Sequence, residues 1–363
     1  MIDPTATIDN PLYEMALALT VTFVVPLAGG IAGTIVANLG SPKKEVRKMK
    51  KNDTRNLVPG LAALLLVLFL NCPDAFSWGS ATHAYINSQL SNGSKHLNDE
   101  VYGGVIPDLF GYMFDSSFLQ DLDAQTHDQS IKVWGSAKSK QEKALAYGFV
   151  SHNDLWGADF TAHHSGRTFG TEEGYVISKA SQLKSILETI PDYAALQLPD
   201  PISLEVSHNF VETGLDILIR RLDPQIGAKL SSAATRRSPV LPALLVRANA
   251  KDLSLLPGMN HGKATRLIQS AEKEFRKSMI LYGQALMLDD ATATQLIAEQ
   301  TADISKGFLS AYGIPLPKGL DLIPLITFAI EQSIILCAND FAEEITATID
   351  FVDQNLQAHG IGD

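Results

Sequence analysis

The spacing of apolar residues after position 77 is typical of helices. Apolar side chains recur at intervals of three and four positions, which places them on one face of a helix with 3.6 residues per turn. Clusters of proline and glycine, such as LPDP at 198–201, separate these segments. The segments are 141–164, 175–190, 203–221, 264–288, 291–311 and 319–357. No stretch combines apolar–polar alternation with β-branched enrichment, so we predict an all-α, multi-helix bundle.

The first 77 residues have a different pattern, which is typical of export. Residues 16–39 carry no charge over 24 positions, a length that can span a bilayer. A basic stretch and a second apolar run of 14 residues follow. Read from Met49, this second part is a complete secretory signal, with Ala75 and Ser77 at the −3 and −1 positions of the cleavage site. We therefore predict a true start at Met49 and a signal peptide over 49–77.

The alternative for this region is a membrane hairpin of two helices with its basic loop in the cytoplasm. Under either interpretation, residues 1–77 form a signal or membrane-targeting region and the chain from Trp78 onward is exported. We expect a periplasmic or secreted protein, which is membrane-anchored if the N-terminal segments are retained.

The exported part is predicted to contain two helical regions. The periodicity breaks within 222–262, which separates a domain over 78–221 from a helical C-terminal extension over 222–363 that packs on it. The extension contains no catalytic motif. Its most apolar segment, 320–341, includes acidic residues, so we interpret it as a buried core helix rather than a membrane span. Three roles are open for the extension: it packs on the first domain, it covers the active site of that domain, or it mediates dimerisation.

The charge of the exported part limits its partners. The whole chain has 29 Lys/Arg and 40 Asp/Glu, and the first 77 residues hold seven and six of these, which leaves a net charge of −12 after Ser77. Such a surface disfavours binding to double-stranded nucleic acid through phosphate contacts, and adsorption to anionic lipid. A local metal site can still outweigh the global charge. The two cysteines, Cys72 and Cys337, suggest neither a disulfide framework nor a zinc finger.

Histidines and acidic residues gather in the stretch SHNDLWGADFTAHH at 151–164. If 143–163 is one helix, His152, Asp159 and His163 lie on one face, whereas Asp154 and His164 point elsewhere. Imidazole and carboxylate are ligands that zinc takes. The alternative is a solvated polar face, although such a face more often carries Lys and Glu.

Two other pairs have spacings suited to a metal. His208 and Glu212 are four residues apart, which places them side by side on a helix, a spacing that is also common by chance. Trp78 would become the N-terminus after signal cleavage. Its α-amino group and carbonyl oxygen could then chelate a metal together with His83.

A fourth pair is Asp108, in the loop GGVIPDL, and His127, nineteen residues later. Asp108 has a structural alternative, because a Pro-Asp sequence readily begins or caps a helix. His261 and His359 lie outside these groups, and no role is assigned to them.

Together these motifs resemble a known family. WGSATHAYI, GGVIPDLFGY, THD, AYGFVSH…D…H and HNFVE follow in order the pattern of the zinc-dependent phospholipase C family, over about residues 78–216. That group includes the amino-terminal domain of glycosylphosphatidylinositol-specific phospholipase D. The fungal zinc-dependent single-strand nucleases share its fold and ligand set, and they also begin with a tryptophan followed five residues later by a histidine.

The resemblance implies a site of up to three zinc ions buried in a helical bundle. It implies one zinc at the Trp78 amino group and carbonyl with His83, and a second at Asp108, His127 and His152. A carboxylate, for which Asp159 is the candidate, bridges these two. The third zinc would take a histidine at the end of the central helix, for which His163 is the candidate, together with His208 and Glu212.

The sequence departs from the family pattern at two points. The family usually places the bridging aspartate four residues after the central histidine, but position 156 is Trp and Asp159 is seven residues on. Either the helix continues for one more turn, or it bulges and Asp154 is used. The following histidine ligand is either His163, which we prefer, or His164.

Clustered zinc ions suit the hydrolysis of phosphodiesters, because they provide hydroxide near neutral pH and neutralise the phosphate oxygens. Asp108 is then both a ligand and the candidate general base. We therefore expect a secreted phospholipase C-type enzyme that acts on phospholipids, with transient contact to a membrane surface. The alternatives are a nuclease-like or other phosphoesterase and a non-catalytic zinc-bound envelope or binding protein.

Overall fold

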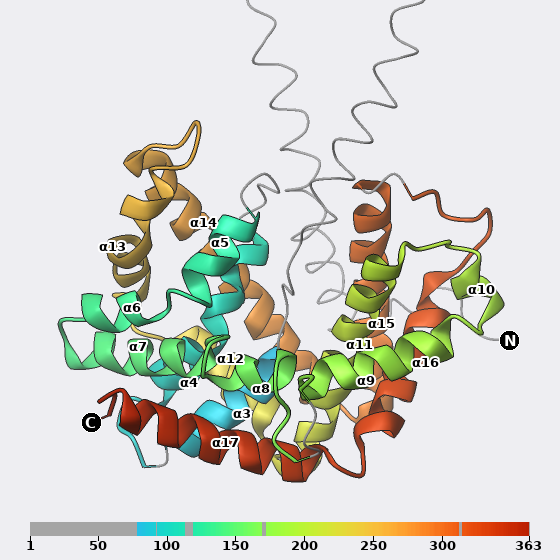
Figure 1. Ribbon diagram of the computed structural model, residues 1–363, viewed down its shortest axis with the longest axis horizontal. Helices are drawn as coiled ribbons and strands as arrows, with labels where there is room; N and C mark the ends of the chain where they lie inside the picture. Colours follow the sequence, from blue (N-terminus) through green and yellow to red (C-terminus); the bar gives the residue numbers. More distant parts are fainter. Residues whose placement is uncertain (1–77, 92, 113–118, 169–171, 312–313, 363) are drawn as a thin grey trace, which may run out of the picture.

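The computed structural model describes residues 78–91, 93–112, 119–168, 172–311 and 314–362, and the predicted signal region lies outside them (Figure 1). Within these residues the fold is all-helical, as the sequence predicts. The first elements are α3 (Ser80–Leu90), α4 (Leu97–Val105), the 3₁₀ helix η1 (Ile106–Tyr112), α5 (Leu119–Thr126), α6 (Ile131–Ser136), α7 (Lys140–His152), α8 (Ala158–His163), α9 (Tyr175–Leu187) and α10 (Pro191–Ala194). The later elements are α11 (Asp200–Leu222), α12 (Ile226–Arg236), α13 (Leu241–Leu253), α14 (His261–Ala285), α15 (Asp290–Ala311), α16 (Leu322–Cys337) and α17 (Phe341–Ala358).

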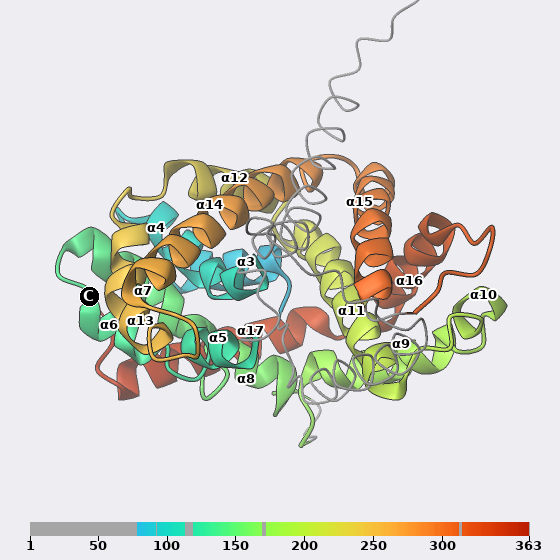
Figure 2. The same cartoon turned by 90° about the horizontal axis from the view of Figure 1, so that it is seen from above.

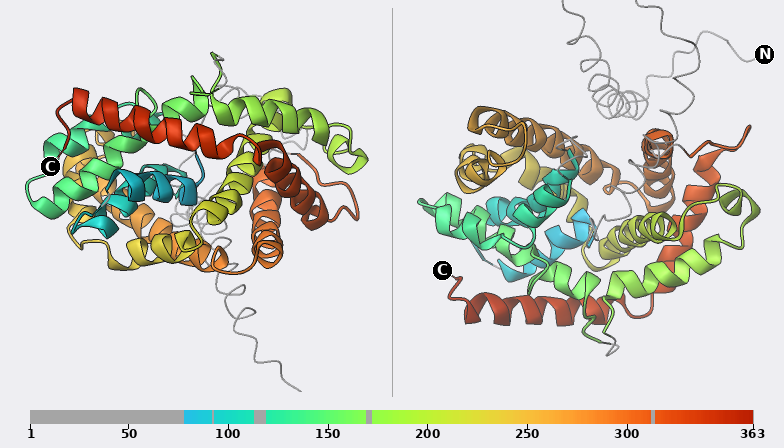
Figure 3. Two further views of the ribbon diagram at one scale, coloured as in Figure 1. Left: turned by 90° about the horizontal axis from the view of Figure 1, so that it is seen from below. Right: turned by 45° about the horizontal axis from the view of Figure 1, so that its top comes forward.

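The helices form two groups with α3 and α8 between them. Figures 1 and 2 both place α4–α7, α13 and α14 at one end, and α9, α10, α15 and α16 at the other. α4 packs along α7 in the first group, and α11 packs on α9 and α16 in the second. α17 crosses the molecule along α3 and α8, which is clearest from below in Figure 3. The region between the two groups is thus where segments distant in the sequence meet.

Helices of the predicted C-terminal extension contact the preceding domain. α12 packs on α4, α14 on η1, and α16 on α11. The stretch 222–262, predicted to lack helical periodicity, contains α12 and α13 instead. α12 buries Ile226, Leu230, Ala233 and Ala234, whose spacing is that of an amphipathic helix, so the prediction that the periodicity breaks throughout this stretch is wrong. Whether the chain divides into two independent domains remains a prediction.

One segment is buried as a core helix in the way the sequence predicts. α16 is apolar over most of its length and buries Leu325, Ile326, Ala329 and Ile330 against the rest of the protein. Among the described residues, no single helix is long and apolar enough to cross a membrane. The pair α16 and α17 reaches that length and composition only when taken together, and it is bent by 73°.

Candidate metal centre

The central segment of the site is two helices rather than the predicted single helix. α7 ends at His152, and Asn153 stops it: the Asn153 side-chain oxygen accepts the backbone N–H groups of Leu155 and Trp156, each at 2.9 Å. An asparagine that binds nearby backbone in this way competes with helix continuation. The chain therefore turns before α8 begins, and neither a longer nor a bulged helix occurs.

This turn determines which aspartate meets His152. On a straight helix, residues seven apart are separated by about 10 Å along the axis, too far to share an ion. The turn instead brings the His152 Nε2 to 2.8 Å from the Oδ2 of Asp159. The grouping of His152 with Asp159 thus arises from a break in the helix, and not from the helical face that the sequence suggested.

Three histidines and two aspartates from five segments converge at this point. The Asp159 carboxylate lies at the centre, with its Oδ1 3.1 Å from the His83 Nε2 and its Oδ2 3.4 Å from the His127 Nε2. The Asp108 Oδ1 lies 3.4 Å from the His152 Nε2 and 3.6 Å from the His127 Nε2. His83 and Asp159 are completely buried, and the Asp108 side chain is 14% exposed. One carboxylate thus separates His83 from the other two histidines.

The outer nitrogens of two of these rings are held by acceptors. The His152 Nδ1 donates to the carbonyl oxygen of Gly104 at 2.8 Å, and the His127 Nδ1 lies 3.0 Å from the Oδ1 of Asp123. With Nδ1 engaged, the Nε2 atoms face the centre, where they can bind a metal once the rings have lost their second proton, which is how metal-ligating histidines are oriented. These two Nε2 atoms are 3.1 Å apart.

Glycine at position 104 makes this packing possible. A Cβ on Gly104 would overlap the side-chain amide of Asn87. That amide donates to the carbonyl oxygen of His83 at 3.1 Å, and its oxygen accepts the Ser151 hydroxyl at 2.8 Å. The GGVIPDL motif therefore allows α3, α4 and α7 to meet beside His83 and His152.

The electrostatics of the cluster favour a cation. Burial lowers the pKa of His152, but the Asp159 and Asp108 carboxylates outweigh it and raise this pKa from 6.5 to about 9. Burial alone would raise the pKa of Asp159, but His152 and His83 hold it well below 3.8. The pKa of His83 is lowered by burial and by His152. The aspartates are therefore ionised and His83 is neutral at pH 7.

A second group of ligand-type side chains lies between α8 and α11. The His208 Nε2 is 3.2 Å from the Glu212 Oε1, and the edge of the His163 ring meets the His208 ring with centroids 5.3 Å apart. On its other side, the His208 Nδ1 lies 3.8 Å from the Glu205 Oε2, so the imidazole is placed between two carboxylates. Burial raises the pKa of Glu212 to about 7, and the acidic neighbours of His208 outweigh burial and raise its pKa to about 10.

Asp154 lies beside both alternative histidines. Its Oδ1 is 2.9 Å from the His163 Nδ1, and its Oδ2 is 2.8 Å from the His164 Nε2. His163 is buried and also meets His208, whereas the His164 side chain is 45% exposed. Asp154 can therefore orient His163 without itself belonging to the group of His163, His208 and Glu212. Asp154, His163 and His164 also bring three ligand atoms close enough together to hold a metal ion. The choice among these ligands stays a prediction.

Trp78 and Asp216 fix the start of α3, which carries His83. The Trp78 indole is buried and donates to the carbonyl oxygen of Ala158 at 2.9 Å. Asp216 accepts the backbone N–H groups of Ala81 and Thr82, at 2.9 and 2.7 Å, and so caps α3 from another helix. The predicted role of the Trp78 main chain as a ligand depends on signal cleavage and stays a prediction.

Asp216 was not singled out from the sequence, although a signal was present. It follows His208 and Glu212 at intervals of four on α11, so all three share one helix face. Asp123, four residues before His127, is a second such case. Both are carboxylates that hold the ligand-bearing segments in place.

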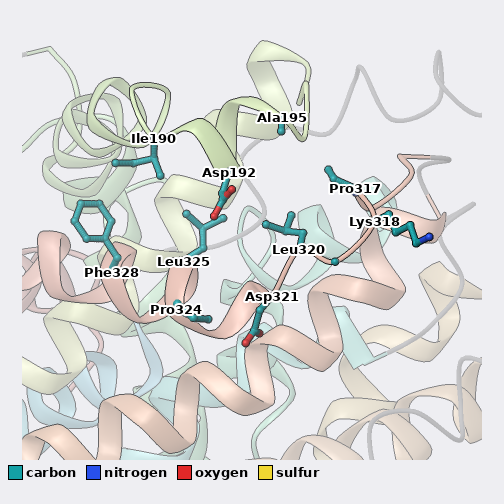
Figure 4. A pocket seen from close by; sticks show the side chains of 11 residues that line it. Ile190, Asp192, Ala195, Pro317, Lys318, Leu320, Asp321, Pro324, Leu325 and Phe328 are labelled. Carbon is teal, nitrogen blue, oxygen red and sulfur yellow. The ribbon is translucent and has the colours of Figure 1, made fainter.

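A separate cavity of about 510 Å³ lies at the other end of α9 (Figure 4). It is lined by the segment 317–321, by the start of α16 and by residues in and around α10, with Asp192, Lys318 and Asp321 as its charged side chains. It contains none of the histidines. α9 separates it from the cluster, because Gly174, just before that helix, bonds to the His163 carbonyl at 3.1 Å.

No family model, curated protein or solved structure matches this chain. The fold and the site define it as an all-helical protein whose buried His/Asp clusters could hold metal ions.

Proposed function

We propose that this protein is a secreted zinc-dependent hydrolase of phosphodiester bonds, of the phospholipase C type, that acts on phospholipids. One observation carries the proposal: the buried carboxylate of Asp159 lies between His83 on one side and His127 and His152 on the other. A bridging carboxylate between two sets of imidazoles is the ligand arrangement of a multi-metal hydrolytic site. The order of the motifs along the chain, which resembles the zinc-dependent phospholipase C family, supports the same function.

The spacing of the donor atoms fits zinc. Two nitrogen ligands at about 2.0–2.1 Å from a tetrahedral zinc ion are about 3.3 Å apart. The Nε2 atoms of His127 and His152 are 3.1 Å apart, and the Asp108 Oδ1 lies 3.4 and 3.6 Å from them. The donor set of imidazole and carboxylate also suits zinc better than calcium or magnesium, which prefer oxygen.

The candidate ligands divide into three zinc positions. His83 and the Asp159 Oδ1 would hold the first together with the Trp78 main chain, and Asp108, His127, His152 and the Asp159 Oδ2 would hold the second. His163, His208 and Glu212 would hold the third. The buried carboxylates of Asp108, Asp159 and Glu212 each face histidine nitrogens, which is consistent with this assignment.

Bound zinc would lower the pKa of a coordinated water and neutralise charge on the phosphate. Asp108 is placed to take the proton from that water, because its side chain is the most exposed of the five side chains that converge around Asp159. Asp123 and Gly104 keep the imidazoles of His127 and His152 oriented through their Nδ1 atoms. The chain thus orients the ligands and accepts one proton.

The charge around the site supports a phospholipid rather than a nucleic acid as the substrate. The outer acceptors of its histidines include the carboxylates of Asp123, Asp154 and Glu205, which add negative charge beside the cluster. A polyanionic nucleic acid requires basic residues along its backbone. A phospholipid presents a single phosphodiester, so zinc alone can offset its charge.

The test uses the exported form, beginning at Trp78. Bound metal is measured by mass spectrometry, and hydrolysis is assayed on phosphatidylcholine vesicles and on single-stranded DNA. Asp159→Asn should lose zinc and at least 100-fold in lipid hydrolysis, in line with the loss of a metal ligand. The matched control is Asp192→Asn in the separate cavity, which should change neither. Less than one zinc per chain would contradict the proposal, and hydrolysis of DNA without lipid would overturn the substrate class.

A further inference from the structure

The short helix α8 has few means of holding itself in place. It has six residues, and within them lie both Asp159 and His163. Isolated helices of this length are unstable in water, so its position depends on tertiary contacts. The segment before it is a turn and the segment after it is a loop, so a neighbouring element must supply those contacts.

α17, at the end of the C-terminal extension, makes such contacts. Thr348 is completely buried, and its hydroxyl lies 2.9 Å from that of Thr161, which is between Asp159 and His163 on α8. The same Thr161 hydroxyl donates to the Ala158 carbonyl at 2.7 Å. α17 therefore reaches the middle of the segment that carries two ligand-type side chains.

Glu344, one turn earlier on α17, holds the loop that follows His163. Its carboxylate is completely buried and accepts the backbone N–H groups of Arg167 and Thr168 at 2.7 and 2.8 Å. It also accepts the Thr168 hydroxyl at 2.7 Å. A buried carboxylate whose donors are backbone amides of a loop fixes the path of that loop.

Aromatic contacts extend this attachment on both sides of α8. Phe351 of α17 stacks on Phe160 with centroids 5.7 Å apart, and the Arg167 guanidinium lies 4.4 Å from the Phe351 ring centre. His359, just after α17, stacks on Trp156 at 4.3 Å. Contacts from α17 and the residue after it thus cover the segment from the turn before α8 to the loop after it.

We propose that α17 is a positioning element of the metal centre, with Glu344 and Thr348 as positioning residues that hold Asp159 and His163 in place through α8 and its following loop, in addition to the contacts that Trp78 and α9 make with α8. The expected effect on zinc binding rests on the proposed function. The positioning itself rests only on the contacts between α17 and the segment around α8. It assigns a role to the C-terminal extension, for which the sequence offers no motif. Glu344 acts on His163 and therefore on the third metal position, whereas Thr348 acts at the centre of α8.

The test compares Glu344→Gln with Glu343→Gln. The two residues are adjacent and lose the same charge, but Glu343 is exposed. Glutamine at 344 keeps one acceptor oxygen and turns an amide N–H₂ towards a backbone donor, so the loop loses part of its attachment. We expect Glu344→Gln to weaken the binding of one zinc by about 10- to 100-fold, the usual effect of disturbing the support of a ligand. Glu343→Gln should bind zinc like the wild type.

A second pair is Thr348→Val and Thr346→Val, because Thr346 is exposed and its hydroxyl bonds only within its own helix. Thr348→Val is isosteric and should weaken zinc binding less than Glu344→Gln, since the Thr161 hydroxyl keeps its bond to Ala158. Zinc affinity is measured by competition with a chromophoric chelator, and thermal unfolding is followed in parallel. If Glu344→Gln lowers the unfolding temperature but leaves zinc affinity equal to that of Glu343→Gln, α17 only packs the core and the inference is wrong.

Hydrogen exchange in the metal-free protein separates this inference from the proposed function. Exchange at 158–168 should accelerate in Glu344→Gln and not in Glu343→Gln, while α7 keeps its protection. A wild type that binds no zinc would end the proposed function, and the exchange result would still decide the positioning role. Unchanged exchange at 158–168 in Glu344→Gln would overturn it.

Discussion

Replacement of Asp216 is expected to cost stability out of proportion to a single surface charge. The Asp216 Oδ1 accepts the backbone N–H and the hydroxyl of Thr82, and its Oδ2 accepts the Ala81 N–H and the Tyr282 hydroxyl. All four donors converge on a carboxylate that is 1% exposed. This carboxylate also caps the N-terminus of α3, where a negative charge is favourable.

The magnitude follows from the donors that each substitution leaves without a partner. Asp216→Ala leaves two backbone N–H groups and the Thr82 hydroxyl unpaired, and at about 1–3 kcal/mol each the loss is about 3–9 kcal/mol. Asp216→Asn keeps one oxygen, and the Tyr282 hydroxyl can turn to accept from the new amide, so only the Ala81 N–H loses its acceptor. The expected loss is about 2 kcal/mol. Domains have a total stability of about 5–15 kcal/mol, so both changes are measurable.

Urea unfolding followed by circular dichroism measures these losses, with Asp200→Asn as the control. Asp200 is at the exposed start of α11, the helix that also carries Asp216, so its replacement should change stability by less than about 0.5 kcal/mol. If Asp216→Ala is as stable as Asp200→Asn to within that margin, the capping interpretation is refuted.

The same variants provide a test by pH. Burial raises the pKa of Asp216 from 3.8 to about 6, even though its four donors favour the ionised form. A carboxyl whose folded-state pKa is raised stabilises the fold below its unfolded pKa, and this contribution is lost as the pH rises through the folded pKa. The wild type should therefore gain stability relative to Asp216→Asn as the pH falls from 7 to 4. A constant difference over this range would contradict the raised pKa.

Three further predictions concern the metal centre. His163→Asn should lose about one equivalent of zinc in a metal analysis, whereas His164→Asn, at an exposed position, should keep the wild-type content; equal losses would assign both as ligands. Asn153→Ala removes the acceptor of two backbone N–H groups and should cost about 1–2 kcal/mol in urea unfolding and weaken zinc binding, and an unchanged zinc affinity would contradict the role of the turn. Zinc binding at pH 7 should release protons, because the pKa values of His152 and His208 are raised to about 9 and 10 in the metal-free protein, and calorimetry in two buffers of different ionisation enthalpy should give different heats.

The helical class could be predicted from the sequence, because it depends on a local pattern, whereas the assignment of the site residues as metal ligands stays a prediction. His208 and Glu212 are one helical turn apart, and the structure places the His208 Nε2 3.2 Å from the Glu212 Oε1. Contacts between distant segments could not be predicted in this way. The meeting of Asp216 with Ala81, 135 residues away, leaves no periodic trace in the sequence.

The grouping of His152 with Asp159 illustrates how a sound choice of residues can rest on the wrong geometry. A spacing of four would place two side chains next to each other on a continuous helix, whereas a spacing of seven places them about 10 Å apart. The longer spacing is therefore compatible with one site only if the helix breaks, and Asn153 provides the break. A broken helix loses the rigidity that a continuous one would give to its second half. The six residues of α8 then need support from elsewhere, and α17 provides part of it: Thr348 contacts α8 itself, and Glu344 holds the loop that follows it. The unusual spacing at 152–159 and the buried polar residues of the C-terminal helix are thus two parts of one arrangement, so variants that restore a continuous helix should reduce the dependence of α8 on α17.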